Sequence, residues 1–117
     1  MTTLDRVKAV LEGHRYNFVN EETFQRGVAA ALTAAGIAFI REAHLGPHDR
    51  IDFLAGDVGI EVKIKGSLTN LTRQVFRYAK SDRVAALLVV TSENRLSSLP
   101  TTILGKPCAV LTFQRAF

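Results

Sequence analysis

A short run of alternating residues places the strongest constraint on how this chain folds. Between residues 58 and 65, branched apolar side chains alternate with charged ones in the order Ile60, Glu61, Val62, Lys63, Ile64 and Lys65. A period of two is typical of a β-strand whose two faces meet different surroundings. The turn residues Ala-Gly-Asp at 55–57 precede this run, and a second strand-like stretch at 50–54 precedes the turn. The segment therefore predicts two antiparallel strands joined by a tight turn.

The flanking segments predict further helices and strands. Apolar residues recur at helical spacing from Leu4 to Leu11, and Asn20 caps a second helix that runs from residue 21 to about 35 and stops at Gly36. Further elements are expected as strands at 37–45, 84–90 and 109–113 and as a helix at about 68–80. The middle of the chain thus predicts an α/β fold in the order helix, strand, strand, strand, helix, strand, with a mixed sheet flanked by helices.

Length and composition restrict the class of protein. A chain of 117 residues predicts a single domain, residues 1–117. Its first residues mix charged and apolar side chains, and its longest apolar run is too short to cross a bilayer, so we expect an intracellular, cytoplasmic protein without a membrane partner. The net charge is +4, and basic residues concentrate between residues 63 and 83. This concentration indicates either a polyanionic partner or a solvated helix face.

Two acids and a lysine occupy the predicted strand pair. Asp52 lies in the first strand, Glu61 and Lys63 lie on one face of the second, and the tight turn makes the strands neighbours. Strand alternation predicts that Ile51 and Phe53 both face away from Asp52. Two carboxylates beside a lysine suit a hard divalent cation next to a phosphate group. The alternative is a cross-strand ion pair on a solvated hairpin.

The two predicted helices supply further polar candidates. Glu21 shares the face of Phe24 and Val28, so its carboxylate should face the sheet, whereas Glu22 lies off that stripe. An acid at a helix N-terminus also simply complements the helix dipole. On the later helix, Gln74 and Tyr78 are four residues apart and share a side, which predicts a hydrogen-bonding ridge beside the acids.

Together these motifs resemble the PD-(D/E)xK nuclease superfamily. The resemblance covers about residues 20–91 and implies a restriction-endonuclease-like core. It implies that Mg²⁺, which Mn²⁺ can replace, is held by the carboxylates of Asp52, Glu61 and Glu21 and by the backbone carbonyl of Val62. One departure is that Ile51 stands at the position of the name-giving proline.

The same resemblance assigns roles to the remaining motif residues. It implies that Lys63 assists the attacking water, and that Gln74 and Tyr78 are similar to a motif of RecB-type nucleases that contacts DNA near the metals. All six motif side chains (Glu21, Asp52, Glu61, Lys63, Gln74 and Tyr78) are therefore expected in the catalytic site. The expected DNA contacts are Lys65, Arg73, Gln74, Arg77 and Lys80.

The expected function is a Mg²⁺-dependent DNA endonuclease acting on branched or structured DNA. The small free-standing domain resembles the Holliday junction resolvases of archaea and phages, which implies a prokaryote or phage source. We expect a homodimer, because a domain this small has one active site and symmetric cleavage of a junction needs two. One alternative is a RecB-like exonuclease acting on DNA ends or single strands. A non-catalytic DNA-binding module of the same fold and a purely structural domain are the remaining alternatives.

Overall fold

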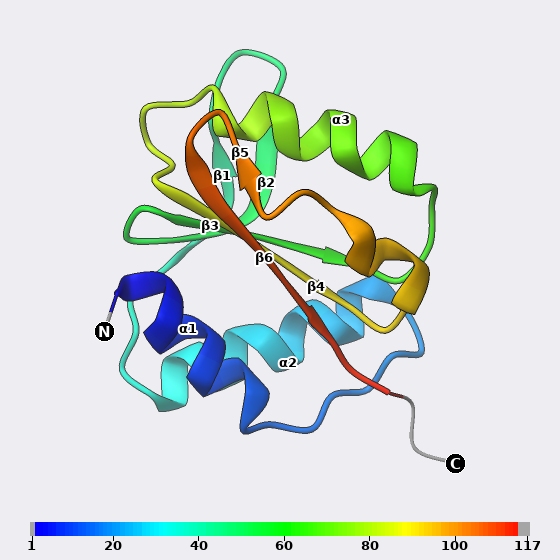
Figure 1. The fold of residues 1–117 in the computed structure, drawn as a ribbon. Coiled ribbons are helices and arrows are strands. Elements are labelled where there is room, and N and C mark those ends of the chain that lie inside the picture. The colour runs from blue at the N-terminus through cyan, green and yellow to red at the C-terminus, as the bar shows by residue number, and fades with distance from the viewer. Residues whose placement is uncertain (1, 115–117) are drawn as a thin grey trace.

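The computed structural model describes residues 2–114, which form helices on both sides of a central sheet (Figure 1). They are α1 (Thr3–Glu12), α2 (Glu21–Ala34), β1 (Ile40–His44), β2 (Arg50–Ala55), β3 (Val58–Lys63), α3 (Leu68–Ala79), β4 (Ala86–Thr91), the 3-10 helix η1 (Asn94–Ser98), β5 (Thr102–Ile103) and β6 (Lys106–Thr112). This order confirms the predicted α/β class, with the predicted sequence of elements in the middle of the chain.

All the strands belong to one mixed sheet in the order β1-β2-β3-β4-β6-β5. Strands β1, β2 and β3 form an antiparallel meander, whereas β3, β4 and β6 run parallel and β5 returns antiparallel to β6. The connection from β3 to β4 passes through α3, which lies on one face of the sheet, while α1 and α2 cover the other face (Figure 1). The domain therefore has three layers, with an apolar core on each side of the sheet.

The helix ends follow local capping signals. Thr2 and Asp5 form a reciprocal capping box at α1, and Asn20 accepts a hydrogen bond from the N–H of Thr23 at α2. Gly36 follows α2 with a φ of 71°, which glycine adopts without strain.

No helix within residues 2–114 is both long and apolar enough to span a bilayer.

Several predicted boundaries were wrong because the ends of the segments are occupied by turns. β1 begins at Ile40 rather than at residue 37, since the N–H of Ile37 bonds to the carbonyl of Leu32 and closes the end of α2. β3 ends at Lys63, so residues 64 and 65 lie beyond the strand. Strand β4 covers Ala86–Thr91 and β6 covers Lys106–Thr112. The sequence analysis predicted neither η1 nor β5.

The two apolar cores differ in whether they border buried polar residues. The core between the sheet and α1 and α2 includes Phe24, Val28, Phe53 and Ile60, and all its buried members are hydrophobic. The core beneath α3 includes Leu71 and Val89 but also borders the buried polar residues Glu61 and Thr91. The acid of β3 therefore lies in the layer between the sheet and α3.

Candidate active site

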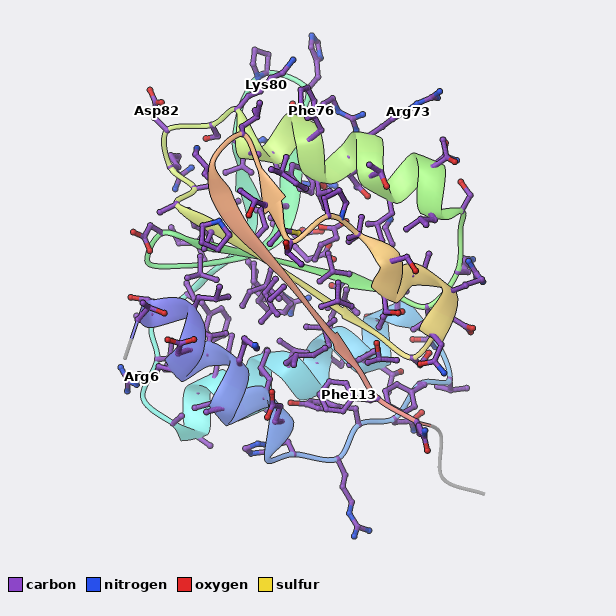
Figure 2. The ribbon with its side chains drawn as sticks, viewed as in Figure 1. Arg6, Arg73, Phe76, Lys80, Asp82 and Phe113 are labelled. Carbon is purple, nitrogen blue, oxygen red and sulfur yellow. The ribbon has the colours of Figure 1, made fainter. Side chains whose placement is uncertain are left out.

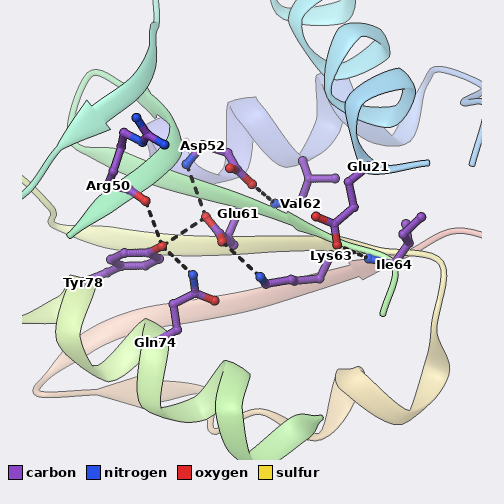
Figure 3. Close-up of polar contacts among 9 residues, drawn as sticks. All are labelled: Glu21, Arg50, Asp52, Glu61, Val62, Lys63, Ile64, Gln74 and Tyr78. Atoms are coloured by element: carbon purple, nitrogen blue, oxygen red, sulfur yellow. Dashed lines mark hydrogen bonds and ion pairs between the residues drawn. The ribbon is translucent and has the colours of Figure 1, made fainter. Parts of the chain in front are cut away.

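The candidate site lies where the pairing between β2 and β3 stops. The strands pair from Ala55 and Val58 at the turn as far as Phe53 and Ile60. Beyond this point, the N–H of Asp52 donates to Oε1 of Glu61 at 3.2 Å, and the N–H of Val62 donates to Oδ2 of Asp52 at 2.8 Å (Figure 3). Each carboxylate thus binds a main-chain N–H of the opposite strand, which holds the two acids next to each other.

This opening changes which face each residue of β2 covers. The expectation that Ile51 and Phe53 lie on the same face was wrong, because Ile51 belongs to the core beneath α3 and Phe53 to the core beneath α1 and α2. Strict alternation fails at Asp52, between them. On β1, Glu42 occupies the matching position with a φ of 50°, while the β1–β2 register is the same on either side of it. Both strands therefore rotate together at Glu42 and Asp52, and Asp52 lies at this rotation.

Burial makes the two carboxyl groups hard to ionise together. Glu61 is only 4% exposed, and its burial, reinforced by the charge of Asp52, raises its pKa to about 8. Burial also raises the pKa of Asp52, although the hydrogen bond from Val62 and the charge of Lys63 oppose this shift. The ammonium Nζ of Lys63 lies 3.7 Å from Oε2 of Glu61. One lysine therefore does not offset two negative charges in this buried place, and ionising both acids together is unfavourable.

Tyr78 of α3 positions the carboxylate of Glu61 through its hydroxyl group. The hydroxyl of Tyr78 lies 3.4 Å from Oε1 of Glu61 and donates at 3.0 Å to the carbonyl of Arg50, while Nε2 of Gln74 donates to the same hydroxyl at 2.8 Å (Figure 3). The predicted ridge beside the acids is therefore present. Tyr78 is 1% exposed. Its hydroxyl thus positions Glu61 and the start of β2 rather than reaching the surface, where DNA would lie.

The helix phase correctly separates the two acids at the start of α2. Oε1 of Glu21 accepts a hydrogen bond from the N–H of Ile64, just beyond β3, at 3.2 Å (Figure 3). Glu22 instead pairs with Arg26 at 2.7 Å on the exposed side of the helix. Glu21 thus approaches the strand end that carries Lys63, and its charge acts on Asp52.

Within residues 2–114, no three His, Cys, Asp or Glu side chains gather tightly enough to form a ready-made metal site.

The predicted DNA contacts are distributed unevenly. Lys65, Arg73 and Lys80 are exposed. Arg77 is also exposed but forms an ion pair with Asp49, with Nε 3.0 Å from Oδ1. Gln74 is half-buried, and its amide is engaged by Tyr78. The exposed outer side of α3 is therefore basic, while Gln74 belongs to the buried network.

Main-chain groups also bind the side chains of the site, and these contacts were not predicted from the sequence. The carbonyl of Arg50 and the N–H of Ile64 each bind a side chain of the site. Thr91 of β4 is fully buried and lies in register with Lys63. Main-chain groups carry no residue-type signal, and the position of Thr91 depends on the pairing of β3 with β4. Only that pairing could have identified Thr91.

Comparison with protein-family models, with curated proteins and with solved structures finds no match for this chain.

Proposed function

We propose that this protein is a metal-dependent deoxyribonuclease that hydrolyses phosphodiester bonds and has the restriction-endonuclease-like fold of the PD-(D/E)xK superfamily. The observation that carries the proposal is the opening between β2 and β3, where Asp52 and Glu61 each bind the main chain of the opposite strand beside Lys63. A solvated cross-strand ion pair would not need a carboxylate that is 4% exposed. Buried paired acids with raised pKa values are typical of functional sites.

The chemistry of the donor set fits a hard divalent cation. Two neighbouring carboxylates supply the oxygen ligands that Mg²⁺ prefers, and their mutual repulsion is relieved by a cation. Asp52 and Glu61 would hold the ion, with Glu21 and the carbonyl of Val62 as the further ligands that the family resemblance implies. When bound, such an ion activates water and stabilises negative charge on phosphoryl oxygens.

The remaining groups of the site have separate roles in this proposal. The ammonium of Lys63 lies at the open edge of the pair, where it orients the attacking water and balances charge that develops on the phosphate. Tyr78 positions Glu61 by hydrogen bonding, and Gln74 in turn positions Tyr78. The exposed cations Lys65, Arg73 and Lys80 would bind backbone phosphates.

Two substrate classes fit these features. A homodimer resembling the Holliday junction resolvases would cut symmetric strands of a four-way junction. A RecB-like exonuclease would degrade DNA from its ends, and the hydrogen-bonded Gln74 and Tyr78 favour this second candidate because they match the motif of that group.

The experiment compares labelled four-way junction, flap, linear duplex, single-stranded and closed circular DNA in Mg²⁺, with EDTA as the control. Cleavage of at least one substrate that EDTA abolishes is expected. Internal cuts near the branch point of the junction identify a structure-specific endonuclease, while linear DNA shortened from its ends, with the circle intact and no internal cuts in the junction, identifies the exonuclease. Light scattering on the same sample measures whether the protein is a dimer. Absence of cleavage in Mg²⁺ and in Mn²⁺ on every substrate would contradict the proposal.

A further inference from the structure

The outer side of α3 borders an apolar hollow that the acids and their partners do not use. Phe76 extends from the helix on the side away from the sheet (Figure 2), and the residue is 43% exposed. The hollow has a volume of about 220 Å³ and lies between α3 and the β5–β6 hairpin, lined by Thr72, Phe76, Pro100, Thr102, Ile103 and Leu104. It is open to solvent next to a second shallow hollow, which Phe76 shares with Arg73 and Arg77.

Leu104 occupies an unusual position at the edge of this hollow. Strands β5 and β6 are joined by Leu104 and Gly105, whose φ angles are 52° and 76°. A two-residue turn with both φ angles positive favours Asn, Asp or Gly, and a leucine there is strained. Leu104 is nevertheless 52% exposed, so burial within the monomer does not offset the strain. An exposed apolar side chain at such a strained position points to contact with a ligand.

The charges around the hollow indicate what kind of ligand it fits. Arg73 and Lys80 extend from α3 on either side of Phe76, and Nζ of Lys80 lies 5.0 Å from the centre of its ring (Figure 2). An aromatic face beside cations complements a nucleotide, which joins a flat base to an anionic phosphate. A two-fold contact with a second copy would bring these cations close to their own equivalents, and this repulsion disfavours self-association.

We propose that an unpaired nucleobase enters this hollow, stacks on Phe76 and packs against Leu104, while its flanking phosphates bind Arg73 and Lys80. This inference rests on the proposed nuclease function and deepens it, because it names DNA with unpaired bases as the substrate class. Bases within a duplex are already stacked and present no free face to a protein ring. Helical spacing directs Phe76 and Tyr78 to opposite sides of α3, so a strand bound at the hollow lies at least one helix diameter (~10–12 Å) from the acids.

The test measures binding without cleavage, by fluorescence anisotropy in EDTA. The probes are a short labelled single strand and a strand of equal length whose central nucleotides are abasic. The wild-type protein should bind the complete strand at least about fivefold more tightly, as expected for base stacking on an aromatic ring. Phe76→Leu and Leu104→Asn should each reduce this ratio towards one. Leu104→Asn suits the positive φ, so it should fold at least as well as the wild type.

A matched control removes an exposed apolar side chain elsewhere. Ile40 on β1 is also 52% exposed, and Ile40→Thr should keep the full preference for the complete strand. Equal affinity of the wild type for both strands, or an unchanged ratio in both hollow variants, would overturn the inference. A dimer that Leu104→Asn dissociates, without any base preference, would overturn it by assigning the hollow to self-association. Cleavage in Mg²⁺ is measured separately on the wild-type protein. Cleavage without a preference for the complete strand refutes only this inference, whereas a preference for the complete strand without cleavage refutes only the nuclease proposal.

Discussion

The main-chain N–H groups at the two ends of the β2–β3 hairpin have different hydrogen-bond acceptors. At the turn end, Phe53 and Leu54 pair directly with Ile60 and Gly59, and every paired residue there has an apolar side chain or none. At the open end, the carboxylates of Asp52 and Glu61 take the N–H groups instead.

The difference shows how a sheet can present charged groups within a core. A regular ladder at the open end would leave the carboxylates without main-chain donors and would cost stability. The exchange of N–H groups fixes both acids in a poorly solvated place where ionising the two together is unfavourable. The turn end thus serves stability, whereas the open end is organised for a cation, and this contrast can be tested at each end.

The largest effect is expected from neutralising the open end. Asp52→Asn and Glu61→Gln keep the shapes of the side chains but remove the charges that would hold a cation. We expect cleavage to fall by more than about 100-fold in each, beyond the 10–100-fold loss typical of groups that merely support metal ligands. Single-turnover cleavage in Mg²⁺ measures this effect. Wild-type rates in either variant would remove the acids from the site.

The open end should also make the metal-free protein sensitive to pH. The pKa of Glu61 is raised from 4.5 to about 8, so its contribution to stability is fully present below pH 4.5 and is lost as the pH rises through 8. Relative to Glu61→Gln, the wild type in EDTA should lose about 2–4 kcal/mol of unfolding free energy between about pH 5 and pH 8. Urea unfolding measures the difference. Parallel pH profiles for the two proteins would contradict a buried charge at Glu61.

The two glutamates at the start of α2 extend the comparison to a neighbouring element. Glu21→Gln can still accept the hydrogen bond from Ile64 while losing its charge, so cleavage should fall by about 10–100-fold with little loss of stability. Glu22→Gln breaks only an exposed ion pair and should change the rate less than about twofold. Single-turnover rates and thermal unfolding distinguish the variants. A larger loss of rate in Glu22→Gln would refute the role of Glu21.

Removing one hydroxyl tests how Glu61 is positioned. Tyr78→Phe leaves the ring in place but deprives Glu61, Gln74 and the carbonyl of Arg50 of their shared partner. We expect a loss of about 1–2 kcal/mol of stability and about a tenfold lower cleavage rate. A positioning role also predicts a weaker affinity for Mg²⁺, measured by thermal shift against metal concentration. Unchanged metal affinity with lower stability would leave Tyr78 with a structural role alone.

The smallest effect on cleavage is expected at the turn end. A Cβ at Gly59 would lie 2.6 Å from Cδ1 of Ile51, so Gly59→Ala should cost of order 1 kcal/mol as the isoleucine shifts. Its cleavage rate, measured well below the unfolding temperature, should stay within about twofold of the wild type because no group of the open end changes. A rate loss as large as that of Tyr78→Phe would show that the two ends are not independent.

The sequence by itself determined most of the helices and strands and which motif residues are neighbours. Asn20 and Gly36 act through the local backbone, so the limits of α2 could be predicted closely. The tight turn at 55–57 makes β2 and β3 neighbours, and helix phase separates Glu21 from Glu22. These features depend on residues close together in the chain, and short-range geometry is nearly the same in any fold.

Only the tertiary structure decided which of these residues are buried and which face they cover. The burial of Glu61 and Tyr78 results from the crossover that lays α3 over the sheet, and no local pattern specifies that contact. Ile51 lies beneath α3 against the alternation rule, because Asp52 gives its N–H to a carboxylate rather than to the regular ladder. Leu104 and Phe76 line the same hollow only because the β5–β6 hairpin folds back towards α3. Burial and electrostatics depend on the whole surroundings of a residue, and residues distant in the chain create those surroundings.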